Sequence, residues 1–496
     1  MARFAWLALA SSLAPTSSAS SASWSHDKRA ALDACLSTAK VPVFTPGTTD
    51  YTQAVKPFNL RLPFKPASIA LPETVQHVQD AVACAVKNNV LVSPRSGGHS
   101  YGAHGLGGED GHLVVDLQQF KTVTVDQKAH TAVVGAGGRL GNIALALYAQ
   151  GKQATSHGTC PGVGIGGLTL HGGYGLISRL KGLTLDQLIS ANVVLYNSTV
   201  VTASATENPD LFWSLRGAGA AFGIVTSFTF KTFDAPENNL VFEYYIKSGN
   251  ASQLATQLGI LQDFAMNTQP PELNMRIFVG RNQFTGVYYG NRTQYDKLMN
   301  PLLTKLGVAT NSGTVSIKAW TDTLLAFSNG PLAQPDVYDY HENFYAKSLM
   351  PDYLNQKSLQ GLANYYFSTA RYINRSWYLL IDMHGGAKSA VSQIGQDATS
   401  YAHRNAIFKM QFNDRIFPDS AVYKPEMMSF LNGWVSAIEA GSPGVEHGMY
   451  INYADTNLTK AQAHSRYWKE HYPKLVDLKT KYDPKKVFEG PQLVGS

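Results

Sequence analysis

Two glycine-rich loops contain the residues of this sequence that could hold a cofactor. The first loop is residues 93–102 (SPRSGGHSYG) and the second is residues 156–168 (SHGTCPGVGIGGL). Successive glycines let backbone N–H groups turn toward one point, which forms a nest for an anion such as a pyrophosphate. Both loops lack room for large side chains, so we predict a flat or extended ligand that approaches the backbone closely.

The three cysteines of the sequence differ in their surroundings. Cys35 and Cys84 both fall in segments with helical spacing, so one disulfide could join them. Cys160 is left over, and it lies in the second glycine loop. Three explanations for it stay open: a buried unreactive thiol, an intermolecular disulfide, or a thiol used in covalent chemistry.

Two other kinds of site are disfavoured. Residues 162–167 fit the Gly-x-Gly-x-x-Gly spacing of nicotinamide-binding proteins, and Asp186 follows downstream. That motif needs a strand ending just before its first glycine, whereas Cys160 and Pro161 stand there. The sequence also predicts no metal site, because no histidine forms a helical pair or lies beside a second cysteine. The histidines considered are His99, His104, His157, His171 and His384.

The elements that must position these loops alternate in the first half of the chain. Apolar residues recur at helical spacing over residues 74–87 and 139–150. The predicted strands, of which the earliest leads into the first glycine loop, are residues 90–92, 112–117, 131–134, 191–196 and 224–231. This half therefore predicts an α/β or α+β region.

After residues 233–236 the sequence changes to long strands rich in aromatic residues. The predicted strands are residues 240–247, 275–281, 284–289, 377–384 and 406–412. Amphipathic helices are predicted at residues 251–266 and 425–440. We expect a wide antiparallel sheet backed by helices on one side, whose other face lines a cleft with Tyr and Trp side chains.

Composition limits the class of protein. A chain of 496 residues exceeds what one compact core usually organises, so two packed regions are expected. Charged residues make up only 15% and hydrophobic residues 44%, which excludes a largely disordered chain. The net charge of +6 comes without a clustered basic stripe, so nucleic acid is not an expected partner.

The N-terminus is typical of a secretory signal peptide. Arg3 precedes a short apolar run and then a stretch rich in Ser and Ala that ends near Ser23. The apolar run is shorter than the about 20 residues that span a bilayer, and no later segment is apolar enough, so no membrane association is expected. We expect a secreted, extracellular protein. Five Asn-x-Ser/Thr sequons fit export and predict surface positions: Asn197, Asn250, Asn291, Asn374 and Asn457.

Four segments carry a resemblance that runs over essentially the whole mature chain. They are residues 94–102 (PRSGGHSYG), 158–164 (GTCPGVG), 211–217 (LFWSLRG) and 452–455 (NYAD). Together they resemble the berberine-bridge-enzyme-like flavoproteins, and among these the secreted fungal oligosaccharide oxidases. The resemblance implies an FAD that is attached twice, through His99 to the 8α-methyl carbon and through Cys160 to C6 of the isoalloxazine ring.

The resemblance also implies the domain organisation. It predicts an α+β fold of two domains, with an FAD-binding domain of the PCMH (vanillyl-alcohol-oxidase-like) type at residues 24–235, its core at about 63–235. A substrate-binding domain with a large antiparallel sheet backed by helices follows at residues 236–444. Residues 445–496 are expected to return to the FAD domain, after a signal peptide at residues 1–23.

The family's functional residues map onto this sequence. Tyr453 is the expected catalytic base, with Asp382 as its proton partner, since oxidation of an alcohol needs a base beside the flavin. Val163, three residues after the linked cysteine, is expected to face the carbon where oxygen attacks. The cofactor-binding residues that the resemblance implies are His99, Cys160, Arg95, Ser96, Gly97, Gly98, Ser100, Gly158, Val163, Gly164, Gly167 and Val225.

The implied substrates are an oligosaccharide and O2. Aromatic rings stack on sugars and amides bind their hydroxyl groups, which suits the residues at the family's sugar groove. Those residues are Tyr101, Tyr345, Gln411 and Tyr450. Leu380 and Tyr378 replace a glutamine and a tryptophan of the glucooligosaccharide-oxidising members, which leaves the preferred sugar open.

The expected reaction is oxidation of the anomeric C1 hydroxyl to a lactone with release of H2O2. One alternative is an oxidase of other alcohols or alkaloid-type metabolites, which would want a closed apolar pocket. Another is a carbohydrate-binding protein on a degenerate flavin fold, against which the intact His99, Cys160 and Tyr453 argue. No oligomeric state follows from the sequence.

Overall fold

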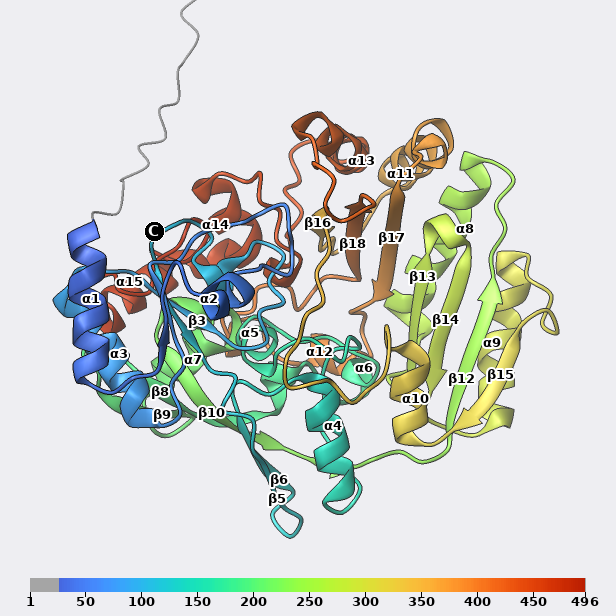
Figure 1. Ribbon diagram of the computed structural model, residues 1–496. Coiled ribbons are helices and arrows are strands. Elements are labelled where there is room, and N and C mark those ends of the chain that lie inside the picture. Colours follow the sequence, from blue (N-terminus) through green and yellow to red (C-terminus); the bar gives the residue numbers. More distant parts are fainter. Residues whose placement is uncertain (1–25, 496) are drawn as a thin grey trace, which may run out of the picture.

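A computed structural model describes residues 26–495, so the predicted signal peptide lies outside the described residues. The chain builds two packed regions that stand side by side in Figure 1, one with smaller sheets and one around a single large sheet. This confirms the predicted α+β architecture. Among the described residues, no helix has both the length and the apolar character that crossing a membrane requires.

The N-terminal region contains a mostly parallel sheet and an antiparallel sheet. The first sheet has the order β1 (Val43–Phe44), β2 (Ser68–Ala70), β4 (Leu113–Asp116), β3 (Val92–Arg95). The second has the order β5 (Val123–Asp126), β6 (Thr131–Gly135), β10 (Ile224–Lys231), β8 (Leu188–Val194), β9 (Val200–Ser204). A short pair joins β7 (Gln153–Ala154) to β11 (Phe233–Asp234). The helices are α1 (His26–Thr38), α2 (Thr49–Ala54), α3 (Val75–Lys87), α4 (Leu140–Ala149), α5 (Ile165–Leu170), α6 (Ser178–Lys181) and α7 (Pro209–Ala218).

The second region contains one antiparallel sheet of seven strands. Its order is β15 (Thr314–Lys318), β12 (Asn239–Tyr245), β14 (Gln283–Tyr288), β13 (Leu273–Phe278), β17 (Ser376–Met383), β18 (Phe408–Arg415), β16 (Phe344–Leu349). The helices that follow the N-terminal region are α8 (Ala251–Asp263), α9 (Arg292–Leu306), α10 (Trp320–Phe327), α11 (Gln356–Ser368), α12 (Ala390–Gln393), α13 (Ser429–Glu439), α14 (Lys460–Trp468) and α15 (Tyr472–Tyr482). Helices α8, α9, α11 and α13 share one apolar core with the sheet, as predicted.

Side-chain alternation gives the large sheet an apolar face and a polar face. In β18, Met410 and Phe412 are buried in the helix-covered core, where the Phe412 ring packs against Trp434 of α13. Lys409 and Gln411, which alternate with them along the strand, face the other region and line a cavity. The polar face of the sheet is therefore the one that can meet a ligand.

Helices α1 and α3 are joined by the disulfide Cys35–Cys84, which confirms the predicted pairing. Helix α3 begins where Thr74 accepts a hydrogen bond from the backbone N–H of His77, a cap that satisfies one free donor of the first turn. The side chains of all five sequon asparagines are exposed, in agreement with their predicted surface positions.

The C-terminal residues pack against the N-terminal region (Figure 1). Lys479 of α15 donates hydrogen bonds to the carbonyl oxygens of Ala221 and Phe488, and the N–H of Val92 in β3 donates to the carbonyl of Val487. This return carries the 3₁₀ turn Ile451–Tyr453 between the two regions.

Several predicted strands are offset from the observed ones by two or three residues, such as residues 191–196 against Leu188–Val194 and residues 406–412 against Phe408–Arg415. The strand expected at residues 90–92 forms at Val92–Arg95, because Pro94 lacks an N–H and is tolerated on β3, the edge strand of its sheet. Strand β16 was not predicted, since all six of its residues are buried and no alternation reveals it.

The two regions are joined by a buried ion pair. Arg404, just before β18, donates two hydrogen bonds to Asp186 at 2.7 and 2.8 Å, and both side chains are at most 4% exposed. Asp186, the residue at the nicotinamide-like spacing, therefore belongs to an ion pair that joins the two regions. A second pair across the regions, Lys121 with Asp336, is exposed by 51% and 83%.

Replacing Asp186 by Ala is expected to lower the free energy of unfolding by roughly 3–5 kcal/mol, because it leaves the buried Arg404 charge without a partner. Lys121→Ala is the matched control, and its expected cost is at most about 1 kcal/mol, since exposed pairs are screened by water. Urea unfolding followed by circular dichroism measures both. Equal losses in the two variants would contradict the assignment.

Candidate functional site

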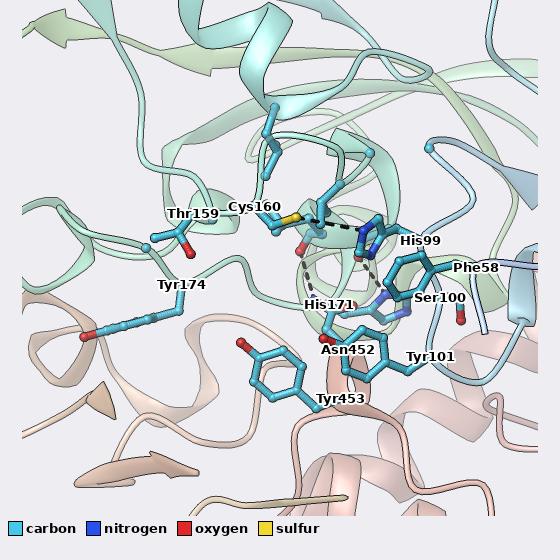
Figure 2. A pocket seen from close by; sticks show the side chains of 18 of the residues that line it. Phe58, His99, Ser100, Tyr101, Thr159, Cys160, His171, Tyr174, Asn452 and Tyr453 are labelled. Atoms are coloured by element: carbon cyan, nitrogen blue, oxygen red, sulfur yellow. Dashed lines mark hydrogen bonds between the residues drawn. The ribbon is translucent and has the colours of Figure 1, made fainter. Parts of the chain in front are cut away.

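A cavity of about 570 Å³ lies between the two regions. Its walls come from both glycine loops, from the start of β10, from the polar face of β13, β17 and β18, and from the C-terminal turn. Figure 2 shows His99 and Cys160 on one side of this cavity and Tyr453 on another. The site exists only because both regions contribute to it.

All twelve predicted cofactor-binding residues line the cavity. Some of their side chains hold the loops rather than point to a ligand. Arg95 pairs with the buried Asp116, and Ser96 donates a hydrogen bond to the carbonyl of Ala136 and accepts one from the N–H of Gly166. Ser100 accepts from the N–H of His104, at the end of the first loop.

The two glycine loops touch backbone to backbone. A Cβ added at Gly97 would lie 2.5 Å from the nitrogen of Gly164, and one added at Gly164 would lie 2.1 Å from the nitrogen of Gly97. No side chain fits at either position. Gly98 turns the first loop with φ of +68°, a conformation that L-residues rarely adopt. This contact fixes His99 and Cys160 relative to each other.

His99 and Cys160 come together at this contact. The Sγ of Cys160 lies 3.9 Å from Nε2 of His99, and the imidazole stacks on Phe58 with ring centroids 3.6 Å apart. Burial, with help from the charge of Arg139, lowers the pKa of His99 to about 3, so its imidazole is neutral and keeps a nucleophilic lone pair. Burial raises the pKa of the Cys160 thiol.

The residues of the cavity fit a flavin. C6 and the 8α-methyl carbon lie along one edge of the isoalloxazine ring, which suits two nucleophiles as close as His99 and Cys160. Gly167 offers open space, because a Cβ there would meet nothing within 4 Å. The large glycine-lined volume leaves room for the rest of FAD.

An unpartnered histidine supports the same fit. Nδ1 of His171 lies 2.9 Å from the carbonyl of Gly167, which can only accept, so Nδ1 carries the proton. Burial lowers the pKa of His171 to about 4, so the ring is neutral and Nε2 holds a lone pair. This Nε2 is buried without a hydrogen-bond partner in the described chain. A hydroxyl or N–H of FAD would satisfy it.

Tyr453 and Asp382 both line the cavity, and a lysine that the sequence analysis missed lies between them. Lys409 donates to Oδ2 of Asp382 at 2.5 Å and to the phenol oxygen of Tyr453 at 3.0 Å. Among the described residues no hydrogen bond joins Tyr453 to Asp382 directly. Burial disfavours the ammonium, but Asp382 and Tyr453 outweigh it and raise the pKa of Lys409, which stays charged.

The predicted sugar-contacting residues divide into two groups. Tyr101, Gln411 and Tyr450 line the cavity. Gln411 donates from Nε2 to the hydroxyls of Tyr101 and Tyr378, each at 2.8 Å, and the Tyr101 ring stacks on Tyr453 with centroids 5.7 Å apart. Tyr378 and Leu380, the two departures from the family pattern, also line it.

Tyr345, the fourth predicted sugar-contacting residue, does not line the cavity. Its side chain is fully buried on the side of β16 opposite to Phe344, and it donates a hydrogen bond to Asp455 at 2.6 Å. The nearby Lys347 binds the same carboxylate. Tyr345 belongs to a buried network that holds the C-terminal turn rather than to the cavity lining.

Two further cavity residues escaped sequence analysis. Lys409 stands opposite Asp382 in the β17–β18 register, and Arg276 of β13 stands opposite Asp382 on the other side. Arg276 packs over the rings of Phe278 and Phe327 and makes no hydrogen bond or ion pair within the described residues. The sequence did offer one signal for these two residues, because each is a cationic residue inside a predicted strand.

Comparison with known proteins identifies the family. Residues 66–204 match the family of FAD binding domains, and residues 449–495 match the family described as berberine and berberine like. These two matches cover the glycine loops and the turn with Tyr453. Together they show that the cavity binds FAD.

Relatives match over the whole chain. A xylooligosaccharide oxidase from Thermothelomyces thermophilus is 45% identical over 97% of both chains. The structure of xylooligosaccharide oxidase from Myceliophthora thermophila C1 in complex with xylobiose superposes with a TM-score of 0.90 at 44% identity, over 94% of this chain and 99% of the other. It confirms the predicted FAD-binding fold.

A second solved structure concerns the flavin itself. Glucooligosaccharide oxidase from Acremonium strictum, with a 6-S-cysteinyl, 8α-N1-histidyl FAD, has a TM-score of 0.89 and 38% identity over 94% of this chain and 99% of that chain. The two residue types in this linkage, cysteine and histidine, are those that the cavity brings together at Cys160 and His99. With these oligosaccharide oxidases, the chain therefore belongs to the berberine-like family of FAD-dependent oxidoreductases.

Proposed function

We propose that this protein oxidises the anomeric C1 hydroxyl of reducing-end oligosaccharides to the lactone, which water opens to the aldonic acid. The observation that carries the proposal is the pairing of Tyr453 with a buried ammonium in a polar cavity that also holds His99 and Cys160. Incubation with xylo-, cello- and chito-oligosaccharides, followed by mass spectrometry of the product, tests it. A product oxidised at C6 would refute it.

The cavity wall suits a sugar. Tyr101 and Tyr378 offer aromatic rings and hydroxyls, and the Oε1 of Gln411 has no partner within the described chain, so it can accept from a sugar hydroxyl. The relatives named as xylo- and glucooligosaccharide oxidases support the same substrate class. A closed apolar pocket, which an alkaloid would need, does not fit this lining.

Two neighbours position the base. Tyr453 takes the C1 hydroxyl proton, and the ammonium of Lys409 donates a hydrogen bond that holds the phenol oxygen in place. Asp382 neutralises the charge of Lys409, so the ammonium can stay buried. When bound, FAD would supply the acceptor for the hydride from C1, and its two electrons, with two protons, would reduce O2 to H2O2.

We place the flavin links at Nδ1 or Nε2 of His99 and at Sγ of Cys160. Their 3.9 Å approach, the neutral imidazole and the linkage of the related glucooligosaccharide oxidase support this assignment. It gives the unpaired cysteine a covalent role. The secretory N-terminal sequence and five exposed sequons support an extracellular location.

The first prediction for this function concerns the covalent links. Acid-precipitated protein is expected to stay yellow, and His99→Ala and Cys160→Ala are each expected to retain flavin through the remaining link. The double variant is expected to release it. The flavin absorbance of the pellet and of the supernatant measures how much flavin is retained. Release of flavin from the unmodified protein would contradict the assignment.

The second prediction concerns the base. Tyr453→Phe is expected to keep the fold and the covalent flavin but to slow anaerobic flavin reduction by roughly 10²–10⁴-fold, the usual contribution of a positioned general base. Lys409→Met is expected to act in the same direction, because the Tyr453 oxygen loses the hydrogen bond that positions it. Stopped-flow absorbance measures the rate constant.

The matched control for Lys409 is Lys479. It is also a buried lysine paired with an aspartate, Asp483, but it lies outside the cavity lining. Lys479→Met is expected to lower the melting temperature and to leave the limiting rate of flavin reduction within about twofold. A Tyr453→Phe enzyme that reduces its flavin as fast as the unmodified enzyme would refute the role of the base.

The third prediction concerns oxygen. Val163 lines the cavity beside Cys160, and its small side chain leaves the flavin accessible to O2. Val163→Leu is expected to slow reoxidation of the reduced flavin by O2 and to leave its reduction by sugar nearly unchanged. Mixing reduced enzyme with oxygenated buffer measures this step, with H2O2 release as the product assay. An unchanged rate of reoxidation would contradict the role of Val163 in oxygen access.

A further inference from the structure

A second cavity, of about 440 Å³, lies outside the flavin cavity. It is formed by the segment after β16 and by the segment between α13 and the C-terminal turn. The backbone of Met350 pairs with that of Gly448 at its edge, with an N–H to carbonyl distance of 2.8 Å. The two cavities share no lining residue, although Tyr450 of the flavin cavity is only two residues from Gly448.

A buried histidine with an unpartnered ring nitrogen lines this cavity. His447 is 4% exposed, and its Nε2 is buried without a hydrogen-bond partner in the described chain. Burial lowers the pKa of His447, so the ring is neutral and presents one donor and one acceptor. Buried polar atoms without partners are rare, and a ligand hydroxyl is one way to satisfy this one.

The rest of the lining combines apolar walls with charged groups at the rim. Tyr353 and Val445 are large apolar residues that stay 55% and 54% exposed, and both line the cavity. The side chains of Asp352 and Glu446 are each 51% exposed, and Lys469 lies 3.9 Å from Asp352. An exposed aromatic ring beside several hydrogen-bonding groups is the usual make-up of a small-molecule site.

We propose that this cavity is a second, non-catalytic site that binds a neutral sugar unit of an oligosaccharide. A sugar ring has an apolar face, which would stack on Tyr353, and a rim of hydroxyl groups, which would reach His447 and Glu446. Two carboxylates against one lysine disfavour an anionic ligand. Within residues 26–495, no group of His, Cys, Asp and Glu side chains is arranged to hold a metal ion.

The inference rests on the proposed function only for the choice of probe, borohydride-reduced xylotriose. This probe lacks the reducing-end hemiacetal, so it cannot be oxidised to a lactone at C1. Calorimetric titration of the holoenzyme reports all binding, and the flavin absorbance reports binding in the flavin cavity alone. We expect a binding heat without a matching flavin signal.

Two variants test where that heat arises. Tyr353→Ala removes the stacking surface, and Val445→Trp fills the cavity from an exposed position that leaves the core intact. Each is expected to weaken the flavin-silent binding by about tenfold or more, the effect of losing one good stacking contact. Tyr372→Ala is the matched control, because Tyr372 is 75% exposed and lies outside the cavity. It is expected to bind as the unmodified enzyme does.

The outcomes separate this inference from the proposed function. If reducing sugars are not oxidised but the flavin-silent heat falls in Tyr353→Ala and Val445→Trp, the second site stands and the proposed function fails. If every binding heat is matched by a flavin signal, the second site is refuted. Flavin-silent binding that both variants retain in full would refute it as well.

Discussion

The buried ammonium of Lys409 is held between Asp382 and Tyr453, which come from two separate parts of the chain. A charge away from water is tolerated only when its partners stand in a fixed geometry. The register of β17 and β18 provides one partner and the C-terminal turn provides the other. The seven-stranded sheet and the returning C-terminus are therefore conditions for keeping this charge buried.

A second fixed geometry faces the first across the cavity. Gly97 and Gly164 bring two distant loops into backbone contact, which places His99 near Cys160. One region of the chain thus supplies the attachment of FAD and the other supplies the lysine and aspartate, while residues 445–495 connect them. The buried Asp186–Arg404 pair joins the same two regions away from the chemistry.

Local signals explain how much the sequence revealed. The glycine loops, His99, Cys160 and Tyr453 lie in contiguous motifs, and strands with clear alternation such as Ile224–Lys231 were predicted with correct bounds. Lys409 was missed because its role arises from a cross-strand register that joins residues 27 apart. Tyr345 was assigned from the family resemblance, and the sequence of β16 could not test that assignment, because the strand is buried on both faces and shows no polar alternation.

The returning C-terminal segment has a consequence for the order of synthesis. The loops that hold FAD leave the ribosome long before Tyr453, and the base arrives within the last part of a chain of 496 residues. In the proposed mechanism, a chain that ends before residue 451 lacks Tyr453 and with it the means to deprotonate a sugar. The proposed oxidation, with its release of H2O2, therefore requires a fully translated chain.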